Sequence, residues 1–195
     1  MRVSILLGTI LGCSACATDE KAAASPPPSR VDGVSAVAAK PVDLEGWCDA
    51  RKTGADAPTL RLPALDGAPM ASSNGWTWVN VWATWCGPCV EEMPMIREWQ
   101  GRLAKDGADV NLQFLSVDEK AETLATWKAQ HPDAPPTMRT AVYADVKPWL
   151  LAMGSDGSTV PVQILADPEG KVRCVRSGAL EKDHYEAIRK VVKGG

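Results

Sequence analysis

Residues 79–94 read VNVWATWCGPCVEEMP, and this stretch decides the fold. It begins inside an aromatic and β-branched run, residues 76–83, which predicts a buried strand. The apolar residues of 89–104 then recur with helical spacing, which predicts a helix. Cys86 and Cys89 therefore lie where a buried strand gives way to a helix.

Predicted strands and helices alternate along the rest of the chain. Further strands are expected at 110–117, near 140–144, at 161–166 and at 171–175, and helices at 119–131, near 146–153 and at 181–193. Asp118 is the expected N-cap of the second helix, and residues 167–170 (DPEG) are expected to form the turn of a hairpin. This order predicts a mixed β-sheet with helices on both faces.

The Cys86-Gly87-Pro88-Cys89 motif carries the chemistry. Unpaired N–H groups and the helix dipole at a helix N-terminus favour a thiolate at Cys86. Cys89, one turn further, can reach back to Cys86 and is shielded from solvent. Pro88 is tolerated in the first turn because its missing N–H would be unpaired there anyway. Position alone therefore assigns attack to Cys86 and resolution to Cys89.

Other uses of a Cys-x-x-Cys pair fit this sequence less well. A zinc site needs two more ligands, and the second such pair, Cys13 and Cys16, falls in the N-terminal leader. Haem attachment needs a histidine directly after the second cysteine, where Val90 stands. We therefore expect no metal site, and a purely structural disulfide stays open as an alternative to redox chemistry.

Residues 79–94 resemble the signature of the TlpA/ResA-type extracytoplasmic thioredoxins, which are membrane-attached disulfide reductases of the thioredoxin superfamily. The resemblance extends in element order from about residue 57 to the C-terminus. It implies an α/β thioredoxin fold, with a central mixed β-sheet flanked by helices, an N-terminal extension and a central insertion. It also implies catalysis with no cofactor beyond the redox-active disulfide between Cys86 and Cys89.

The resemblance assigns a further acid to the cysteine pair. Asn80 stands where cytoplasmic thioredoxins carry a buried aspartate, and an amide cannot relay protons as a carboxylate does. Glu92 matches the glutamate that ResA-type proteins use near their thiols. Its i, i+3 spacing from Cys89 places both residues on one helix face. A solvated surface glutamate is the alternative.

The family also places a cis-proline opposite the active cysteines, and Val160-Pro161 is the matching position. Such a proline has no N–H and leaves the Val160 backbone free to pair with an extended client strand. Trp85 is expected to cover the active site. The expected substrate-binding residues are Trp85, Gly87, Pro88, Val160 and Pro161. Valine beside the proline departs from the small polar residue frequent in the family, which puts the substrate preference in question.

Two other activities known on this fold fit poorly. Copper-binding relatives need Cys-x3-Cys and a distant histidine, whereas here the spacing is Cys-x2-Cys, and His131 and His184 are both expected at the surface. Peroxide reduction needs Thr-x-x-Cys before a helix, and Thr84 is one residue too close to Cys86.

Cys48 and Cys174 are the cysteines left over in the domain. In an oxidising compartment two such residues tend to pair, and some TlpA-type proteins tie an N-terminal segment to a late strand in this way. We therefore expect a structural disulfide between them. Two buried free thiols are the alternative.

The N-terminus resembles an export signal. Arg2 precedes a short apolar segment, too short to span a membrane, and Gly12-Cys13 after aliphatic residues resembles the lipobox of bacterial lipoproteins. Cys13 is the expected lipidation site, Cys16 is a second candidate, and an ordinary cleaved signal is the alternative. The expected organisation is a signal peptide at 1–12, a flexible tether rich in Ala, Ser and Pro at 13–45, and a thioredoxin-like domain at 46–195.

Composition narrows the function further. The 195 residues include 21 basic and 24 acidic side chains, and the resulting net charge of −3 argues against a nucleic-acid partner. We expect a lipid-anchored protein on the periplasmic side of the membrane that reduces disulfides of client proteins and is recharged by a membrane electron donor. The alternatives are a non-catalytic lipoprotein that binds or assembles other proteins, and a net oxidase or isomerase of envelope proteins.

Overall fold

The structure is a computed structural model that describes residues 43–71 and 74–194. Cys13, Cys16 and nearly all of the predicted signal and tether lie outside the described residues. The strands are β1 (Ala50–Arg51), β2 (Trp76–Trp82), β3 (Val110–Ser116), β4 (Thr137–Arg139), β5 (Val162–Ala166) and β6 (Val172–Ser177). The helices are α1 (Leu44–Trp47), α2 (Gly87–Lys105), α3 (Ala121–Gln130), α4 (Val146–Met153) and α5 (Tyr185–Val192), with 3₁₀ turns at Tyr143–Asp145 and Lys182–His184.

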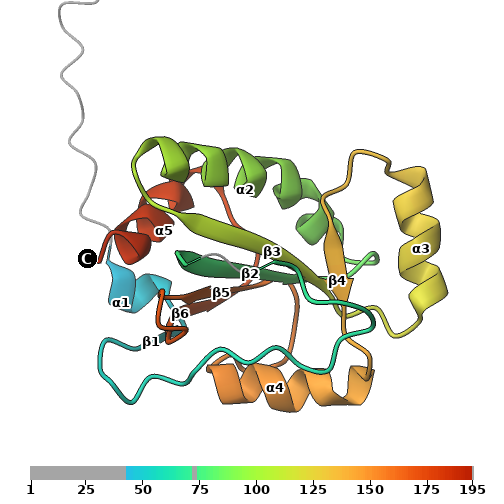
Figure 1. The fold of residues 1–195 in the computed structure, drawn as a ribbon, viewed down its shortest axis with the longest axis horizontal. Coiled ribbons are helices and arrows are strands. Elements are labelled where there is room, and N and C mark those ends of the chain that lie inside the picture. The colour runs from blue at the N-terminus through green and yellow to red at the C-terminus, as the bar shows by residue number, and fades with distance from the viewer. Residues whose placement is uncertain (1–42, 72–73, 195) are drawn as a thin grey trace, which may run out of the picture. The chain divides into compact units, whose positions relative to one another are not determined.

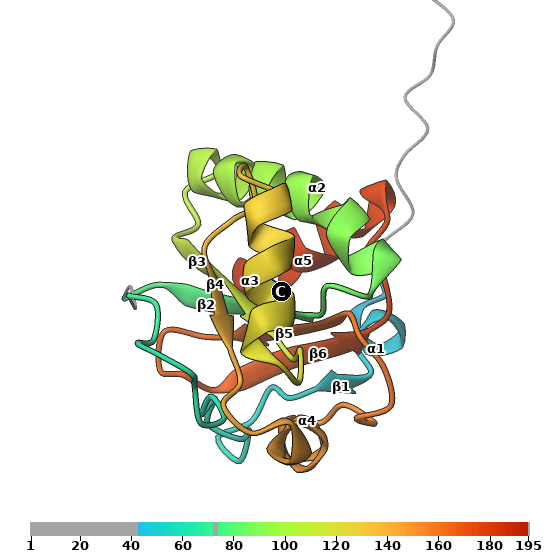
Figure 2. The ribbon, with the colours of Figure 1, turned by 90° about the vertical axis from the view of Figure 1, so that its right-hand side faces the viewer.

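The strands form one six-stranded mixed sheet in the order β1-β6-β5-β2-β3-β4. β2 runs parallel to β3 and antiparallel to β5, and β5 and β6 form the predicted antiparallel hairpin. Helices α2 and α5 lie on one side of the sheet and α4 on the other (Figure 1). The orthogonal view again places α2 and α4 on opposite sides (Figure 2). The predicted mixed sheet flanked by helices is thus confirmed.

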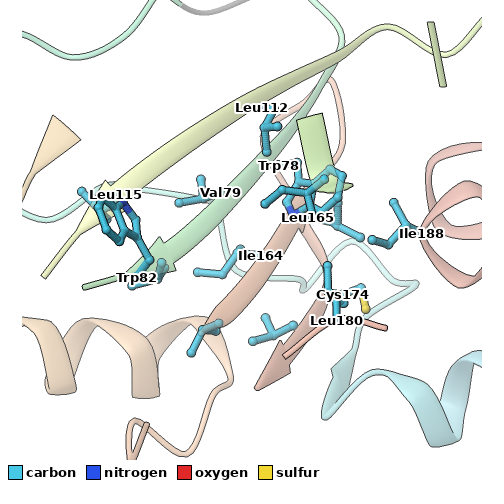
Figure 3. Packing of buried hydrophobic residues seen from close by; sticks show 14 of the residues in the cluster. Trp78, Val79, Trp82, Leu112, Leu115, Ile164, Leu165, Cys174, Leu180 and Ile188 are labelled. Atoms are coloured by element: carbon cyan, nitrogen blue, oxygen red, sulfur yellow. The ribbon is translucent and has the colours of Figure 1, made fainter. Parts of the chain in front are cut away.

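The core forms where the apolar faces of α2 and α5 meet the central strands. Helix α2 buries residues with the spacing of a single helical face, namely Cys89, Glu92, Met93, Ile96, Trp99 and Leu103. Trp78 in β2 pairs in register with Leu112 of β3 and Leu165 of β5. Figure 3 shows these three side chains together, with Ile188 of α5 close by. The last residues of β2 are buried, so the chain leaves the core only as it reaches the cysteine motif.

The structure corrects the position of the third predicted strand. The strand expected near 140–144 is instead β4 at Thr137–Arg139, which pairs in parallel with the end of β3. Met138 lies opposite Leu115 and is buried, whereas residues 141–145 are exposed. The position of β4 is therefore set by Met138, whose buried side chain lies opposite Leu115 on β3.

The ends of two predicted helices are also corrected. Asp118 does not cap the helix after β3, because its carboxylate is bonded to Thr84 and Ser116, and α3 begins later at Ala121. The predicted C-terminal helix is split into a 3₁₀ turn at Lys182–His184 and α5. Of the two predicted surface histidines, His131 is exposed. His184 is half-buried, with its ring edge-on to Trp47 at 6.0 Å between ring centroids.

The N-terminal extension is attached to the far edge of the sheet. Helix α1 is followed by Cys48, which is disulfide-bonded to Cys174 of β6 with 5.5 Å between the Cα atoms. The short strand β1 then pairs with β6. No helix in the described part of the chain is long and apolar enough to cross a membrane.

Candidate active site

Cys86 is the N-cap of α2, and the sequence explains why the helix begins there. Gly87 and Pro88 occupy the first helical positions, where the missing proline N–H leaves no gap in the hydrogen-bond ladder. The Sγ atom of Cys86 lies 3.3 Å from the backbone N of Cys89 and accepts from it. Cys86 and Cys89 form a disulfide, with Cys89 fully buried and Cys86 6% exposed. The sulfur nearer the solvent is thus the one at the positive end of the helix.

The loop before Cys86 is fixed by a buried carboxylate. Asp118 accepts from the Thr84 hydroxyl at 2.7 Å and from the Thr84 backbone N–H at 3.1 Å. Its second oxygen also accepts from the Ser116 hydroxyl at 2.7 Å. Asp118 therefore connects the end of β3 to the segment that carries Trp85 and Cys86. Sequence analysis assigned Asp118 only a capping role and missed this connection.

The loop before β5 faces the disulfide. The Val160–Pro161 peptide bond is cis, and the Val160 carbonyl oxygen lies 3.7 Å from Cys86 Sγ. Thr159 donates its hydroxyl to the same carbonyl at 3.1 Å. The structure therefore brings Cys86, Cys89 and the Val160-Pro161 step together.

Two surface hollows adjoin the cysteine motif. One, of about 250 Å³, is lined by apolar side chains that include Trp85, Tyr143, Leu150 and Val160. Trp85 is 65% exposed and lines this hollow. The other, of about 590 Å³, is lined by Pro88, Glu92 and Leu180 and by several further charged residues. The second hollow carries five charged residues, whereas Lys147 is the charged residue of the first, so the two surfaces next to the motif differ in charge.

Glu92 is buried beneath the motif, on the face of α2 that carries Cys89. It is not the solvated surface glutamate that the sequence left open, because only 4% of it is exposed. The Leu180 N–H donates to Oε2 at 2.7 Å, while Asn80 Nδ2 and Gln163 Nε2 each donate to Oε1 at 2.8 Å. Burial raises the pKa of Glu92 above its ordinary value, and these three hydrogen bonds oppose that rise.

The partners of Glu92 form a buried polar network between β2 and β5. Asn80 and Gln163 are cross-strand neighbours in register. Gln163 Oε1 accepts from Trp78 Nε1 at 2.8 Å and from Asn80 Nδ2 at 3.2 Å. Sequence analysis assigned no role to Gln163. The signal was a glutamine within an otherwise apolar buried strand, where an amide needs partners.

No group of three or more His, Cys, Asp and Glu side chains gathers in the described residues in a way that could hold a metal ion. The Glu92 carboxylate is instead bonded by amide and backbone donors, while Asn80 Oδ1 has no partner among the described residues. The arrangement suits thiol–disulfide exchange, which needs a reactive sulfur, a shielded partner and a nearby proton acceptor.

The sheet order, the helix-capping disulfide and the facing cis-proline together define a thioredoxin-like protein of the TlpA/ResA type. The chain belongs to the AhpC/TSA family, whose sequence profile matches residues 53–191.

Individual relatives agree with this assignment. The chain is 25% identical over 145 residues to the thiol-disulfide oxidoreductase ResA of Bacillus subtilis, covering 73% of this chain and 76% of that protein. It is 31% identical over 97 residues to thioredoxin of Mycobacterium tuberculosis, covering 49% of this chain and 76% of that protein. Among solved structures, the thioredoxin-related protein of Neisseria meningitidis serogroup B superposes with a TM-score of 0.51 at 23% identity, covering 66% of this chain and 90% of that one.

Proposed function

We propose that the protein is an extracytoplasmic thiol–disulfide oxidoreductase that reduces disulfides in client proteins. The observation that carries the proposal is the Cys86–Cys89 disulfide at the N-terminus of α2, with the Val160 carbonyl 3.7 Å from Cys86 Sγ. The relatives named thiol-disulfide oxidoreductase ResA and thioredoxin support the same chemistry. Glycine and proline between the cysteines are the thioredoxin dipeptide, and the thioredoxin potential of about −270 mV favours reduction over oxidation.

The reaction proceeds in two exchanges. The thiolate of reduced Cys86 attacks one sulfur of the client disulfide, and the other client sulfur leaves as a thiolate. Cys89 then loses its proton and attacks Cys86, so that the second client sulfur leaves and the Cys86–Cys89 bond forms. Two electrons pass to the client, whose thiolates take up two protons. A membrane electron donor returns the two electrons to the Cys86–Cys89 pair.

Other residues of the site hold the client and move the proton. An extended client segment lies against the Val160-Pro161 step, next to the apolar hollow at Trp85. Glu92, one helical turn beyond Cys89, accepts the proton that Cys89 releases. Its carboxylate is buried, as a group that exchanges a proton with a shielded sulfur should be.

The experiment that tests the catalytic proposal compares two cysteine variants. Cys86→Ser should abolish reduction of insulin disulfides, because the attacking sulfur is lost. Cys89→Ser should instead accumulate a covalent adduct with the client, since the resolving sulfur is lost. Unchanged turnover in Cys86→Ser would end the proposal, as would a Cys86–Cys89 bond that thiol reductants cannot open. A potential far above that of thioredoxin would favour an oxidase or isomerase.

The anchor is a separate part of the proposal. A lipid on Cys13 and a tether at 13–45 would hold the domain, proposed to begin near residue 46, at the outer side of a membrane. Cys13→Ser should move the protein from the membrane fraction to the soluble extracytoplasmic fraction, and Cys16→Ser is the matched control that should not. The reverse pattern would place the lipid on Cys16.

A further inference from the structure

Gln163 is a buried amide whose two ends are both bonded. It lies within the apolar strand β5 and is 1% exposed. Its oxygen accepts from Trp78 Nε1 at 2.8 Å and from Asn80 Nδ2 at 3.2 Å, while its Nε2 donates to Glu92 at 2.8 Å. A buried amide persists only where such partners exist. The side chain is therefore placed by its bonds rather than by apolar packing.

Trp78 determines which way the Gln163 amide faces. An indole N–H can only donate a hydrogen bond, so the atom facing Trp78 Nε1 must be the oxygen of Gln163. The NH2 group of Gln163 must then face Glu92. An amide held from one side alone could turn over and present its oxygen to Glu92 instead.

Glu92 consequently meets N–H donors at both of its oxygens. The backbone of Leu180 donates to one oxygen, and the amides of Asn80 and Gln163 donate to the other. An ionised carboxylate accepts all three bonds as charge-assisted bonds, whereas protonation removes the charge that strengthens them. This donor set stabilises the form of Glu92 that can take up a proton.

We propose that Gln163, oriented by Trp78, is a positioning residue that holds Glu92 in its ionised, proton-accepting form beside the Cys86–Cys89 pair. The inference deepens the proposed reductase function and rests on it, because there Glu92 receives the proton of Cys89. Through the Gln163–Glu92 hydrogen bond, a residue of β5 thereby influences proton transfer at helix α2.

The charged surroundings of Glu92 come from α2 itself, through Glu91, and from the segment at 181–183. The hollow shared with Glu92 is lined by the charged residues Glu91, Glu181, Lys182 and Asp183. On reduction, the thiols of Cys86 and Cys89 also titrate nearby. By contrast, β2 and β5 contribute the neutral partners Trp78, Asn80 and Gln163. Substitutions at 78 and 163 leave every charge in place, so they isolate the effect of the donors.

The test measures the pKa of the Glu92 carboxyl directly. The oxidised protein, labelled with ¹³C at glutamate carboxyls, is titrated by NMR, and the Glu92 signal is assigned by its absence in Glu92→Gln. Gln163→Met removes the donor at similar length, and Trp78→Phe removes the shorter of the two hydrogen bonds that orient the Gln163 amide, leaving only the longer one from Asn80. Each is expected to raise the pKa of Glu92 by about one unit, the size expected for losing one charge-assisted hydrogen bond.

Trp82→Phe is the matched control. Trp82 lies on the same strand as Trp78 and is equally buried, but its Nε1 has no hydrogen-bond partner among the described residues. This substitution should leave the Glu92 titration unchanged. The proposal is overturned if Gln163→Met and Trp78→Phe titrate as Trp82→Phe does. If Gln163→Met does not fold, the comparison of the two tryptophan variants decides alone.

A kinetic measurement separates this proposal from the function it rests on. Protein carrying a thionitrobenzoate group on Cys86 releases thionitrobenzoate when Cys89 attacks. The rate of this release is measured as a function of pH. The pH below which the rate falls should be higher in Gln163→Met than in the native protein, by the shift seen in the NMR titration. A shifted titration without any insulin reduction would refute the reductase and leave the positioning of Glu92 intact. Normal insulin reduction with unshifted profiles would refute only the positioning.

Discussion

Glu92 shows how a single buried acid is balanced between two opposing effects. Desolvation favours its neutral form, while three N–H donors favour the carboxylate. Burial is the larger effect, so the pKa of Glu92 lies above its ordinary value of 4.5. A group poised in this way can exchange a proton with a neighbouring thiol at a pH where an exposed glutamate would stay ionised.

The raised pKa makes a prediction about stability. Because the folded state binds the Glu92 proton more tightly than the unfolded state, its stabilising effect is full below pH 4.5. That effect is lost as the pH rises through the folded-state pKa. The free energy of unfolding of the native protein minus that of Glu92→Gln should therefore fall as the pH increases, by about 1.4 kcal/mol for each unit of pKa difference.

Urea denaturation between about pH 4 and pH 8, spanning the titration range of a raised carboxyl, checks this prediction. Glu91→Gln, at the exposed neighbouring position on the same helix, controls for the loss of a charge from α2. A stability difference that rises with pH would mean that the hydrogen bonds outweigh burial and that the pKa of Glu92 is lowered.

At the level of single residues, sequence reasoning identified the positions that a motif marks. Cys86, Cys89, Glu92 and Pro161 were all singled out. The structure places the Val160 carbonyl beside Cys86 and buries Glu92 on the helix face that carries Cys89. Gln163 was missed because its role depends on the β2–β5 register, which sets it opposite Asn80. The local pattern shows a glutamine in an apolar strand, which needs a partner, but it does not show which residue that partner is.

Strands and helices could be predicted from the sequence where their hydrophobic pattern extends over many residues. β2, α2 and the β5–β6 hairpin have extended periodic patterns or a strong turn, and all three were predicted. Helix α1 has four residues and β1 has two, too few to show a period. β4 was misplaced by a few residues because its position is set by the edge of β3 rather than by its own composition.

Interactions between elements override local preferences at the active site. Asp118 suits a helix N-cap by type, yet the bonds to Thr84 and Ser116 occupy its carboxylate, and α3 starts without a side-chain cap. The loss of a cap is a modest cost, and in exchange the loop before Cys86 is fixed. The active-site loop is thus rigid at its start, which favours a fixed distance between Cys86 and the Val160 carbonyl.

On the scale of the whole described domain, the N-terminal extension is held to β6 by several independent contacts. Asp49 accepts from the Ser177 N–H at 2.6 Å, and Arg176 donates to the Trp47 carbonyl at 3.0 Å. The Cys48–Cys174 disulfide joins the same two segments across 126 positions of sequence. These contacts lie on the edge of the sheet away from β3 and β4.

The disulfide should contribute mainly by restricting the unfolded chain. A loop of this length corresponds to about 5 kcal/mol in the chain-entropy model. The double variant Cys48→Ala, Cys174→Ala should therefore unfold at a lower denaturant concentration, with a free energy of unfolding reduced by up to that amount. Insulin reduction measured where both proteins are folded should stay unchanged, because the pair takes no part in the exchange. An unchanged unfolding midpoint would show that the β1–β6 contacts suffice without the covalent bond, whereas lost reductase activity in a folded double variant would give the second disulfide a redox role.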